Sequence, residues 1–273
     1  MINILMKIMT TKPTLAIIDA DAFLFYSGWA HKNNLTKFGI FAVKEKVDQM
    51  IRAVLNNVKA DYYIGFYGVK SSSTFRHSFA TVKPYKGSRT SEEWQEFFKP
   101  VIKKHYKDKW SFYGTEKLEA DDAVVIAYNQ YKEDYNVVMI GEDKDMHQIG
   151  EFLWYNPKNN TSKNLLYDEG RRFYWCQHIE GDSADNISGV KGQGKKSPIK
   201  DLINELDPYT EEEAFNIVRD EHIRVYGEDY LYHLLENHIL LTMMKEPIFD
   251  YPIDPILTAV KKEKESILKR LNI

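Results

Sequence analysis

Short apolar runs alternate with a longer amphipathic segment in the first part of the chain. The runs at 15–18, 62–67 and 137–140 have the length and hydrophobicity of strands, and such runs are typical of strands buried on both faces. Between the first two, apolar residues recur every three or four positions from Val43 to Val58, as on one face of a helix. The order strand, helix, strand predicts an α/β fold with a central, mainly parallel sheet flanked by helices.

Later segments carry weaker signals. Residues 91–106 have apolar side chains on one side and lysines elsewhere, which predicts a helix that Pro100 interrupts and whose basic face could line a nucleic-acid channel. Residues 152–155 and 165–167 predict two short strands joined by a turn, after which the sheet should end. We therefore expect an α/β core over residues 1–175 and a helical region over residues 176–273.

The composition fits a globular protein with a real core. The chain has 273 residues, of which 43% are hydrophobic, and its formal net charge is −3. No run approaches the roughly 18 apolar residues of a membrane span, and Met1 to Met9 is too short for a signal peptide, so we expect a cytosolic protein. The single cysteine, Cys176, excludes an internal disulfide and is interpreted as a buried thiol.

Acidic residues follow two of the predicted strands. Asp19 comes directly after the strand at 15–18, and Asp143 and Asp145 follow the strand at 137–140. Ligands of open α/β sheets bind outside the carboxyl ends of strands. These three carboxylates therefore belong to a candidate site.

A second acidic group begins an amphipathic helix predicted from residue 119 to residue 131. Glu119, Asp121 and Asp122 lie in its first turn, and Glu119 and Asp122 share a face with Asp121 on the flank. Acids in a first turn also complement the helix dipole, and acids after a strand can simply be solvated. That simpler explanation suits one acid better than a converging set.

The convergence of these acids favours a metal site. Each like-charge contact at about 4 Å costs about 1 kcal/mol in water and about 4 kcal/mol at an effective dielectric constant of 20. A converging set therefore needs a cation or raised pKa values. Ligation by oxygen alone favours magnesium or manganese over zinc.

A basic segment with an aromatic residue lies upstream of the acids. It contains Lys83, Tyr85, Lys86 and Arg89, and Arg76 precedes it. Cations around an aromatic ring suit a phosphate backbone and an unstacked base. Taken alone, the same cations could form an ordinary solvated surface.

A glycine-rich segment, residues 178–197, is the second informative region. Asp182 and Asp185 are three positions apart and would share one face of a helix. The spacing from Gly189 to Lys195 imitates a nucleotide-binding phosphate loop, but Lys196 stands where Ser or Thr should be and no strand precedes it. A helix-hairpin-helix is the better interpretation, with exposed amides and positive charge from Gly189, Lys191, Gly192, Gly194, Lys195 and Lys196.

Together these motifs resemble the 5′-nuclease family, which comprises flap endonucleases, the 5′-nuclease domain of bacterial DNA polymerase I and bacteriophage 5′→3′ exonucleases. The resemblance covers roughly residues 14 to 200, in the family's motif order, and the free-standing chain is most similar to the phage enzymes. It rests on Asp19, Phe75-Arg76, and the segments 85–89 (YKGSR), 119–122 (EADD), 143–145 (DKD) and 181–194.

The resemblance implies a structure-dependent 5′→3′ exonuclease or flap endonuclease that hydrolyses DNA with two Mg²⁺ or Mn²⁺ ions, in the replication or repair of a phage or bacterium. Lys86 and Arg89 would contact the scissile phosphate, Tyr85 would stack on the terminal base, and Arg76 and Lys83 would bind DNA. The inner metal ligands would be Asp19, Glu119, Asp121 and Asp143, with further metal or its water held by Asp122, Asp145, Asp182 and Asp185.

The resemblance also implies partners. The hairpin at 189–194 would hold the duplex backbone, in the family often with a bound K⁺ ion. The substrate would be DNA with a free 5′ end or a 5′ flap, with RNA–DNA hybrids left open, and the protein would be a monomer without membrane contact. Whether the 29 residues between Arg89 and Glu119 form an arch over the 5′ end is also open.

One position departs from the family pattern. Family members usually carry an aspartate just after the third strand, where this chain reads Gly65-Phe66-Tyr67-Gly68-Val69, with no acid. One metal ligand is therefore missing or supplied elsewhere, and Glu142 is a candidate replacement. The metal stoichiometry depends on this position.

Two other classes of protein compete with this interpretation. Asp19-Ala20-Asp21 and the later 141–145 segment imitate the first and last motifs of a haloacid-dehalogenase-type phosphatase, but Phe23 departs from that pattern and nothing in it explains residues 119–122. The missing acid at Gly68 motivates the second alternative, a catalytically inactive, structure-specific DNA-binding protein.

Overall fold

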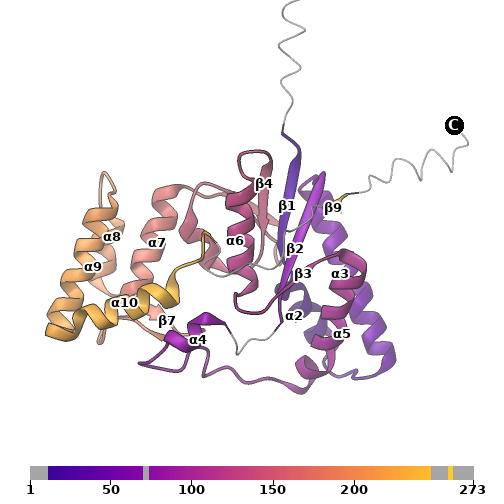
Figure 1. Cartoon of the computed structure of the whole chain (residues 1–273), viewed down its shortest axis with the longest axis horizontal. Helices are drawn as coiled ribbons and strands as arrows, with labels where there is room; N and C mark the ends of the chain where they lie inside the picture. Colours follow the sequence, from indigo (N-terminus) through magenta and orange to yellow (C-terminus); the bar gives the residue numbers. More distant parts are fainter. Residues whose placement is uncertain (1–11, 70–73, 247–257, 261–273) are drawn as a thin grey trace, which may run out of the picture.

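The centre of the fold is a largely parallel sheet. A computed structural model describes residues 12–69, 74–246 and 258–260, and the main strand order is β3-β2-β1-β4-β5-β6 (Figure 1). All neighbours in this order are parallel except β5 and β6. The strands are β1 (Thr14–Asp19), β2 (Tyr62–Gly68), β3 (Tyr113–Thr115), β4 (Asn136–Ile140), β5 (Leu153–Asn156) and β6 (Thr161–Asn164). The predicted α/β fold is confirmed.

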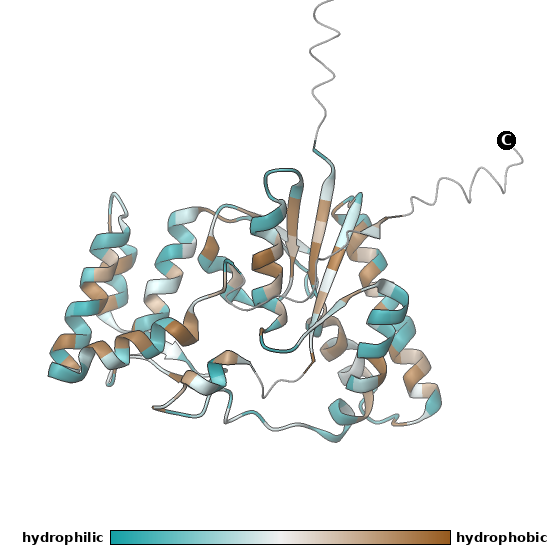
Figure 2. Cartoon of the chain, viewed as in Figure 1, coloured by the Kyte–Doolittle hydropathy of each residue, from teal (hydrophilic) through white to brown (hydrophobic). Residues whose placement is uncertain are grey.

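Helices cover both faces of this sheet. On one face, α2 (Asp21–Ala30), α3 (Lys37–Asn57) and α5 (Glu93–Trp110) pack against Ala16 and Ile18 of β1. On the other face, α6 (Ala120–Tyr131) packs against Leu15 and Ile17. Because both faces are covered, successive residues of β1 and β4 are apolar, and Figure 2 shows hydrophobic residues concentrated in these strands.

A helical region lies beside the α6 side of the sheet (Figure 1). It has its own apolar core, which includes Tyr174, Ile203, Val218 and Leu240. The elements outside the sheet layers are α4 (Phe75–Phe79), η1 (Lys144–Ile149), α7 (Tyr167–Glu180), β7 (Gly181–Asp182), β8 (Ile187–Ser188), α8 (Pro198–Asn204), α9 (Glu211–Tyr226), η2 (Gly227–Asp229) and α10 (Tyr230–Leu241).

Two predictions about single elements were wrong. Helix α5 runs through Pro100 without interruption, because Trp94, Phe98 and Ile102 bury the same face on both sides of the proline. The second strand of the predicted pair is β6, while residue 167 begins α7. All four residues of β6 are exposed and polar, so this edge strand has no hydrophobic signal.

The predicted division of the chain at residue 175 does not coincide with the end of an element. That position lies inside α7, which is continuous from Tyr167 to Glu180. The sheet does not end at residue 167 either, because β9 (Thr258–Ala259) pairs antiparallel with β2. The C-terminal part of the chain therefore returns to the core.

Some predictions concern residues outside the described ranges. Met1 to Met9 and part of the helical region predicted over residues 176–273 lie there. Within the described ranges, no helix is both long and apolar enough to cross a membrane.

Candidate metal centre and its basic rim

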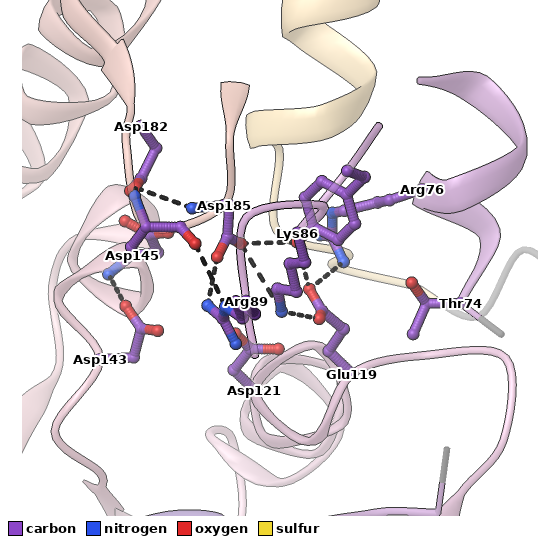
Figure 3. A network of polar contacts seen from close by, with 12 residues as sticks. Thr74, Arg76, Lys86, Arg89, Glu119, Asp121, Asp143, Asp145, Asp182 and Asp185 are labelled. Carbon is purple, nitrogen blue, oxygen red and sulfur yellow. Dashed lines mark hydrogen bonds and ion pairs between the residues drawn. The ribbon is translucent and has the colours of Figure 1, made fainter. Parts of the chain in front are cut away.

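Carboxylates from separate parts of the chain meet at the carboxyl edge of the sheet. Asp19 ends β1, Asp143 and Asp145 follow β4, and the remaining acids come from the start of α6 and from the β7–β8 turn. Figure 3 shows the acids of η1, α6 and the β7–β8 turn directed toward one region. The predicted acids brought together there are Asp19, Glu119, Asp121, Asp143, Asp145, Asp182 and Asp185.

Local backbone hydrogen bonds fix the orientation of several of these acids. Asp19 Oδ1 accepts from the amide of Asp21 at 3.0 Å, and Asp143 Oδ1 accepts from the amide of Asp145 at 2.9 Å. Asp182 Oδ1 accepts from the amide of Ala184 at 2.7 Å. In each case an acid binds the amide two residues later, a local pattern that suits Asp in turns.

The electrostatics of the cluster fit a hard divalent cation. Burial, with repulsion from neighbouring carboxylates, raises the pKa of Asp19 to about 8 and that of Asp145 to about 7. The same causes raise the pKa of Asp121 well above its usual value. Carboxylate oxygens of Glu119, Asp121 and Asp122 lie within 4.8 Å of one another, although both oxygens of Asp122 also accept from Arg76. A divalent cation would relieve this repulsion, and oxygen donors are the ligands that Mg²⁺ and Mn²⁺ prefer.

Lys86 lies among the carboxylates rather than on the outer surface. Its ammonium contacts Glu119 and lies 3.6 Å from Asp185 Oδ2, and its amide donates to the carbonyl of Asp185 at 2.8 Å. Burial would lower the pKa of Lys86, but these carboxylates raise it above its usual value. The residue has a left-handed φ of 53°, a conformation that is costly for a side chain other than glycine and clusters at functional sites.

Arg89 forms the exposed rim of the same cluster. Its side chain is 53% exposed, pairs with Asp185 and donates through Nε to the carbonyl of Ala184 at 3.1 Å. Lys83 is exposed a few residues upstream. The two side chains give the edge of the centre a positive charge that DNA phosphates can approach.

The structure corrects the role predicted for Arg76. Its side chain is 2% exposed and forms a bidentate pair with Asp122, at 2.5 and 2.7 Å. It also donates to the carbonyls of Leu240 and Thr242 at the end of α10. A side chain enclosed in this way cannot contact DNA, so Arg76 is a structural residue.

Asp122 is likewise not positioned as a direct metal ligand. Besides Arg76, its oxygens accept from the amides of Glu119 at 3.3 Å and Met244 at 3.0 Å. The carboxylate is fully buried, and these donors occupy both of its oxygens. Its predicted place among the metal ligands is therefore corrected: Asp122 compensates the buried charge of Arg76.

Tyr85 is not positioned to stack on a base. Its ring is 4% exposed, and its hydroxyl donates to Glu119 at 2.6 Å and to Asp185 at 2.7 Å. One hydroxyl proton serves one acceptor at a time, so the phenol bridges two acids that would otherwise repel each other. This enclosed position corrects the predicted stacking role.

The glycine-rich region also differs from the prediction. Asp182 and Asp185 do not share a helix face, because residues 183–186 form the turn between β7 and β8. The two acids still lie together, since the amide of Asp185 donates to Asp182 Oδ1 at 3.2 Å. The short strands close this turn tightly because Gly181 and Gly189 pack against each other without side chains.

The glycines after β8 lie in a loop of successive turns. Gly192 has a φ of 84°, and a Cβ at Gly192 or Gly194 would meet no other atom within 4 Å. Lys191, Lys195 and Lys196 are all exposed on this loop, which joins β8 to α8. Its backbone and lysines are therefore accessible to a phosphate backbone.

Two residues that the sequence did not assign to the site also bear on it. Gln177 on α7 donates to Asp145 Oδ1 at 2.7 Å and orients that acid. Lys103 on α5 donates to the carbonyl of Val69 at 3.1 Å and brings positive charge near the end of β2. Lys103 stood among the lysines of the predicted basic helix, but Gln177 had no sequence signal.

Glu142 does not replace the acid missing at Gly68. Its carboxylate accepts from Lys158 Nζ at 2.7 Å and also pairs with the hydroxyl of Tyr26. Its side chain is 37% exposed. The structure thus gives Glu142 partners outside the carboxylate cluster.

Comparisons with known proteins agree with this arrangement. DNA polymerase I of Bacillus subtilis (strain 168) is 26% identical over 229 residues, which are 73% of this chain and 24% of the polymerase. The 5′-3′ exonuclease of Mycoplasmopsis pulmonis (strain UAB CTIP) is 26% identical over 193 residues, which are 66% of this chain and 61% of that protein. The chain thus spans about a quarter and about three fifths of the length of these two relatives.

Solved structures of bacteriophage T5 proteins share the fold. T5 5′-exonuclease with bound divalent zinc aligns with 84% of this chain and 89% of its own, with a TM-score of 0.59 and 22% identity. The T5 D15 flap endonuclease, in a complex with DNA and metal ions, aligns with 84% of this chain and 99% of its own, with a TM-score of 0.54 and 20% identity.

A family match covers the part of the chain that holds most of the acids. Residues 14–169 match the family described as 5′-3′ exonuclease, N-terminal resolvase-like domain. These residues include β1 to β6 and the candidate metal centre up to Asp145. Since the match covers more than half of the chain, this protein belongs to the 5′-3′ exonuclease family.

Proposed function

We propose that the chain is a divalent-metal-dependent 5′-nuclease that hydrolyses phosphodiester bonds of DNA at a free 5′ end or a 5′ flap. Its place would be the replication or repair of phage or bacterial DNA, and it would act as a monomer. Membership of the 5′-3′ exonuclease family supports this activity. The same membership excludes the haloacid-dehalogenase-type phosphatase considered from Asp19-Ala20-Asp21.

One observation carries the proposal: an acidic cluster and a partly buried lysine, Lys86, occupy the same place. The charge of Asp143 raises the pKa values of both Asp19 and Asp121, and the charge of Lys86 lowers the pKa values of all three acids. A solvated acidic surface would not hold a lysine in its middle with a left-handed backbone. A centre that binds both metal cations and a phosphate needs carboxylates for the cations and a positive side chain for the phosphate.

The predicted residues fall into three groups with separate tasks. Asp19, Glu119, Asp121 and Asp143 would hold the inner cation, and Asp145, Asp182 and Asp185 a second one. When bound, Mg²⁺ or Mn²⁺ ions would lower the pKa of the attacking water and stabilise the leaving oxygen. Lys86 and Arg89 would bind the scissile phosphate and stabilise the negative charge that develops on it.

Cation binding would also free Lys86. Its ammonium now pairs with Glu119, and the same carboxylate is a proposed cation ligand. A divalent ion competing for Glu119 would weaken that pair and leave the lysine to a phosphate. The chain would thereby couple metal occupancy to substrate contact.

The loop at 189–196 would bind the duplex away from the chemistry. Its exposed lysines and glycine amides suit successive phosphates, in the manner of a helix-hairpin-helix, and its carbonyls suit a K⁺ ion. Lys83 would add a backbone contact on the rim. DNA substrates are proposed first, and RNA–DNA hybrids are a second substrate class to be compared.

The direct test uses 5′-labelled DNA with an overhang, a flap or a blunt end, and a matching RNA–DNA hybrid, each with Mg²⁺ and with a chelator. Release of short labelled products only with Mg²⁺ is the expected result. Tight, structure-dependent binding without cleavage in Mg²⁺ or Mn²⁺ would instead identify the inactive DNA-binding protein that the missing acid at Gly68 suggests.

A further inference from the structure

The carboxylate of Asp21 lies beside Gly68, at the end of β2. The amide of Gly68 donates to Asp21 Oδ2 at 3.1 Å. A Cβ built on Gly68 would lie 3.2 Å from the same oxygen, and no other neighbouring atom lies within 4 Å of it. A side chain at position 68 would therefore extend into the space that the Asp21 carboxylate now borders.

Asp21 reaches this place because of where α2 begins. It is the first residue of α2, two positions after Asp19 at the end of β1, and β1 pairs in parallel with β2. Its amide is bonded to Asp19 Oδ1, so the two acids are held by a short, fixed link. The chain thus has no acid directly after β2, but two acids, Asp19 and Asp21, at the end of β1 and the start of α2.

The charges around Asp21 are those of the metal centre. It is close enough to Asp19 for its charge to raise the pKa of that residue, and Lys86, Lys99 and Lys103 act on Asp21 itself. Asp21 as a whole residue is partly exposed. Glu142, the other acid considered for this role, is paired with Lys158 and Tyr26.

We propose that Asp21 is a further ligand of the divalent cation in the metal centre and supplies from the start of α2 the carboxylate oxygen missing at Gly68. This inference rests on the proposed function, because it assumes that Asp19, Asp121 and Asp143 hold Mg²⁺ or Mn²⁺. With Asp21 as a ligand, the inner cation site does not need Glu142 to replace the acid missing after β2.

The test measures Mn²⁺ binding to the full chain without DNA, by calorimetric titration. Asp21→Asn keeps the shape of the side chain and an acceptor for the Gly68 amide, so folding should survive, and circular dichroism checks this. Glu142→Gln is the matched control, because it removes a nearby acid with partners outside the cluster. We expect Asp21→Asn to weaken the tighter Mn²⁺ site at least about tenfold, and Glu142→Gln to change it less than about twofold.

The second part of the test moves the carboxylate from position 21 to position 68. In the double variant with Asp21→Ala and Gly68→Asp, the acid returns to the end of β2, where the removed side chain leaves space for it. We expect this variant to bind Mn²⁺ at least about tenfold more tightly than Asp21→Ala alone. A general effect of charge at α2 would not predict recovery by an acid placed on a different element.

The outcomes separate this inference from the proposed function. Wild-type Mn²⁺ binding by Asp21→Asn, together with loss of binding by Asp143→Asn, would overturn the role of Asp21 and leave the nuclease proposal standing. Loss of the tight site in Glu142→Gln, with Asp21→Asn unaffected, would assign the ligand to Glu142 instead. No Mn²⁺ binding by the wild-type chain would overturn both.

Discussion

The guanidinium of Arg76 and the carboxylate of Asp122 form a bidentate pair, at 2.5 and 2.7 Å, inside the protein. The pair joins α4 to the first turn of α6, and the further bonds of Arg76 to Leu240 and Thr242 reach the end of α10. Two residues that sequence reasoning assigned to DNA and metal therefore connect the helical region to the α/β core.

Arg76→Ala should destabilise the protein severely. Removing one partner of a buried ion pair leaves the other charge buried without compensation, which costs about 3–5 kcal/mol. Urea denaturation measures the free energy of unfolding. Arg219→Ala, which removes an arginine paired with exposed Asp220, is the control and should change stability by less than about 0.5 kcal/mol. Equal effects of the two substitutions would contradict the structural role of Arg76.

Asp143→Asn should abolish cleavage while leaving duplex binding nearly intact. The residue is exposed at the end of β4 and belongs to the acidic cluster rather than to the core, so the substitution removes metal ligation without disturbing packing. Cleavage of 5′-labelled DNA in Mg²⁺ and binding in Ca²⁺ are measured in parallel. Undiminished turnover in this variant, or in the wild type with excess chelator, would argue against metal-dependent catalysis.

Lys86→Ala should lower turnover far more than affinity. A cation beside the scissile phosphate stabilises charge that develops in the transition state, and losing one such group costs about 10²–10³-fold in rate. Single-turnover rates at saturating DNA isolate this effect. Lys83→Ala, an exposed neighbour, should instead weaken binding and leave the saturated rate unchanged. A wild-type single-turnover rate for Lys86→Ala would remove the lysine from the catalytic machinery.

Much of this centre follows from the positions of the parallel strands. The apolar runs of β1 and β4 locate two neighbouring strands, and because parallel strands end at the same edge, Asp19 and Asp143 had to lie near each other. The acids predicted in the first turn of a helix from residue 119 are equally local, and they lie at the start of α6. The predictions that rested on β1, β4 and the start of α6 therefore held.

The remaining contacts depend on residues far apart in the sequence. Arg76 and Asp122 are 46 positions apart, and nothing in the local pattern distinguishes a buried arginine from one that binds phosphate. The partnership of Asp21 and Gly68 requires the register of β1 on β2. β6 and β9 are too polar or too short to produce a hydrophobic pattern. Such features need tertiary structure.

Replacing Lys191, Lys195 and Lys196 together with alanine should weaken duplex binding without affecting saturated cleavage. Each phosphate neutralised adds about −0.9 to the slope of log affinity against log salt, so the slope should flatten by up to roughly two or three units. Binding is measured in Ca²⁺ over a salt series. Replacement of the exposed lysines Lys32, Lys46 and Lys132 is the matched control. An unchanged slope on duplex DNA, or a loss of affinity for single-stranded DNA as large as the loss for duplex, would show that the loop does not bind the duplex specifically.

The stabilisation that Mg²⁺ gives the protein should increase with pH. Burial and neighbouring carboxylates raise the pKa of Asp19 from 3.8 to about 8 and that of Asp145 to about 7. Between the unfolded and folded pKa values the folded protein binds more protons than the unfolded chain, so in chelator these two groups lower stability as pH rises through that window. Protons also compete with the cation for the same oxygens, and that competition fades as pH rises.

Melting temperatures measured with chelator and with Mg²⁺, at about pH 5.5 and about pH 8.5, test whether the stabilisation by Mg²⁺ increases with pH. The difference between the two melting temperatures at one pH removes the contribution of histidines and other groups that titrate outside the centre. The difference should be larger at the higher pH, and Asp19→Asn should reduce that pH dependence. A Mg²⁺ effect that is equal at both pH values would mean that the titrating carboxylates are not the ones that hold the cation.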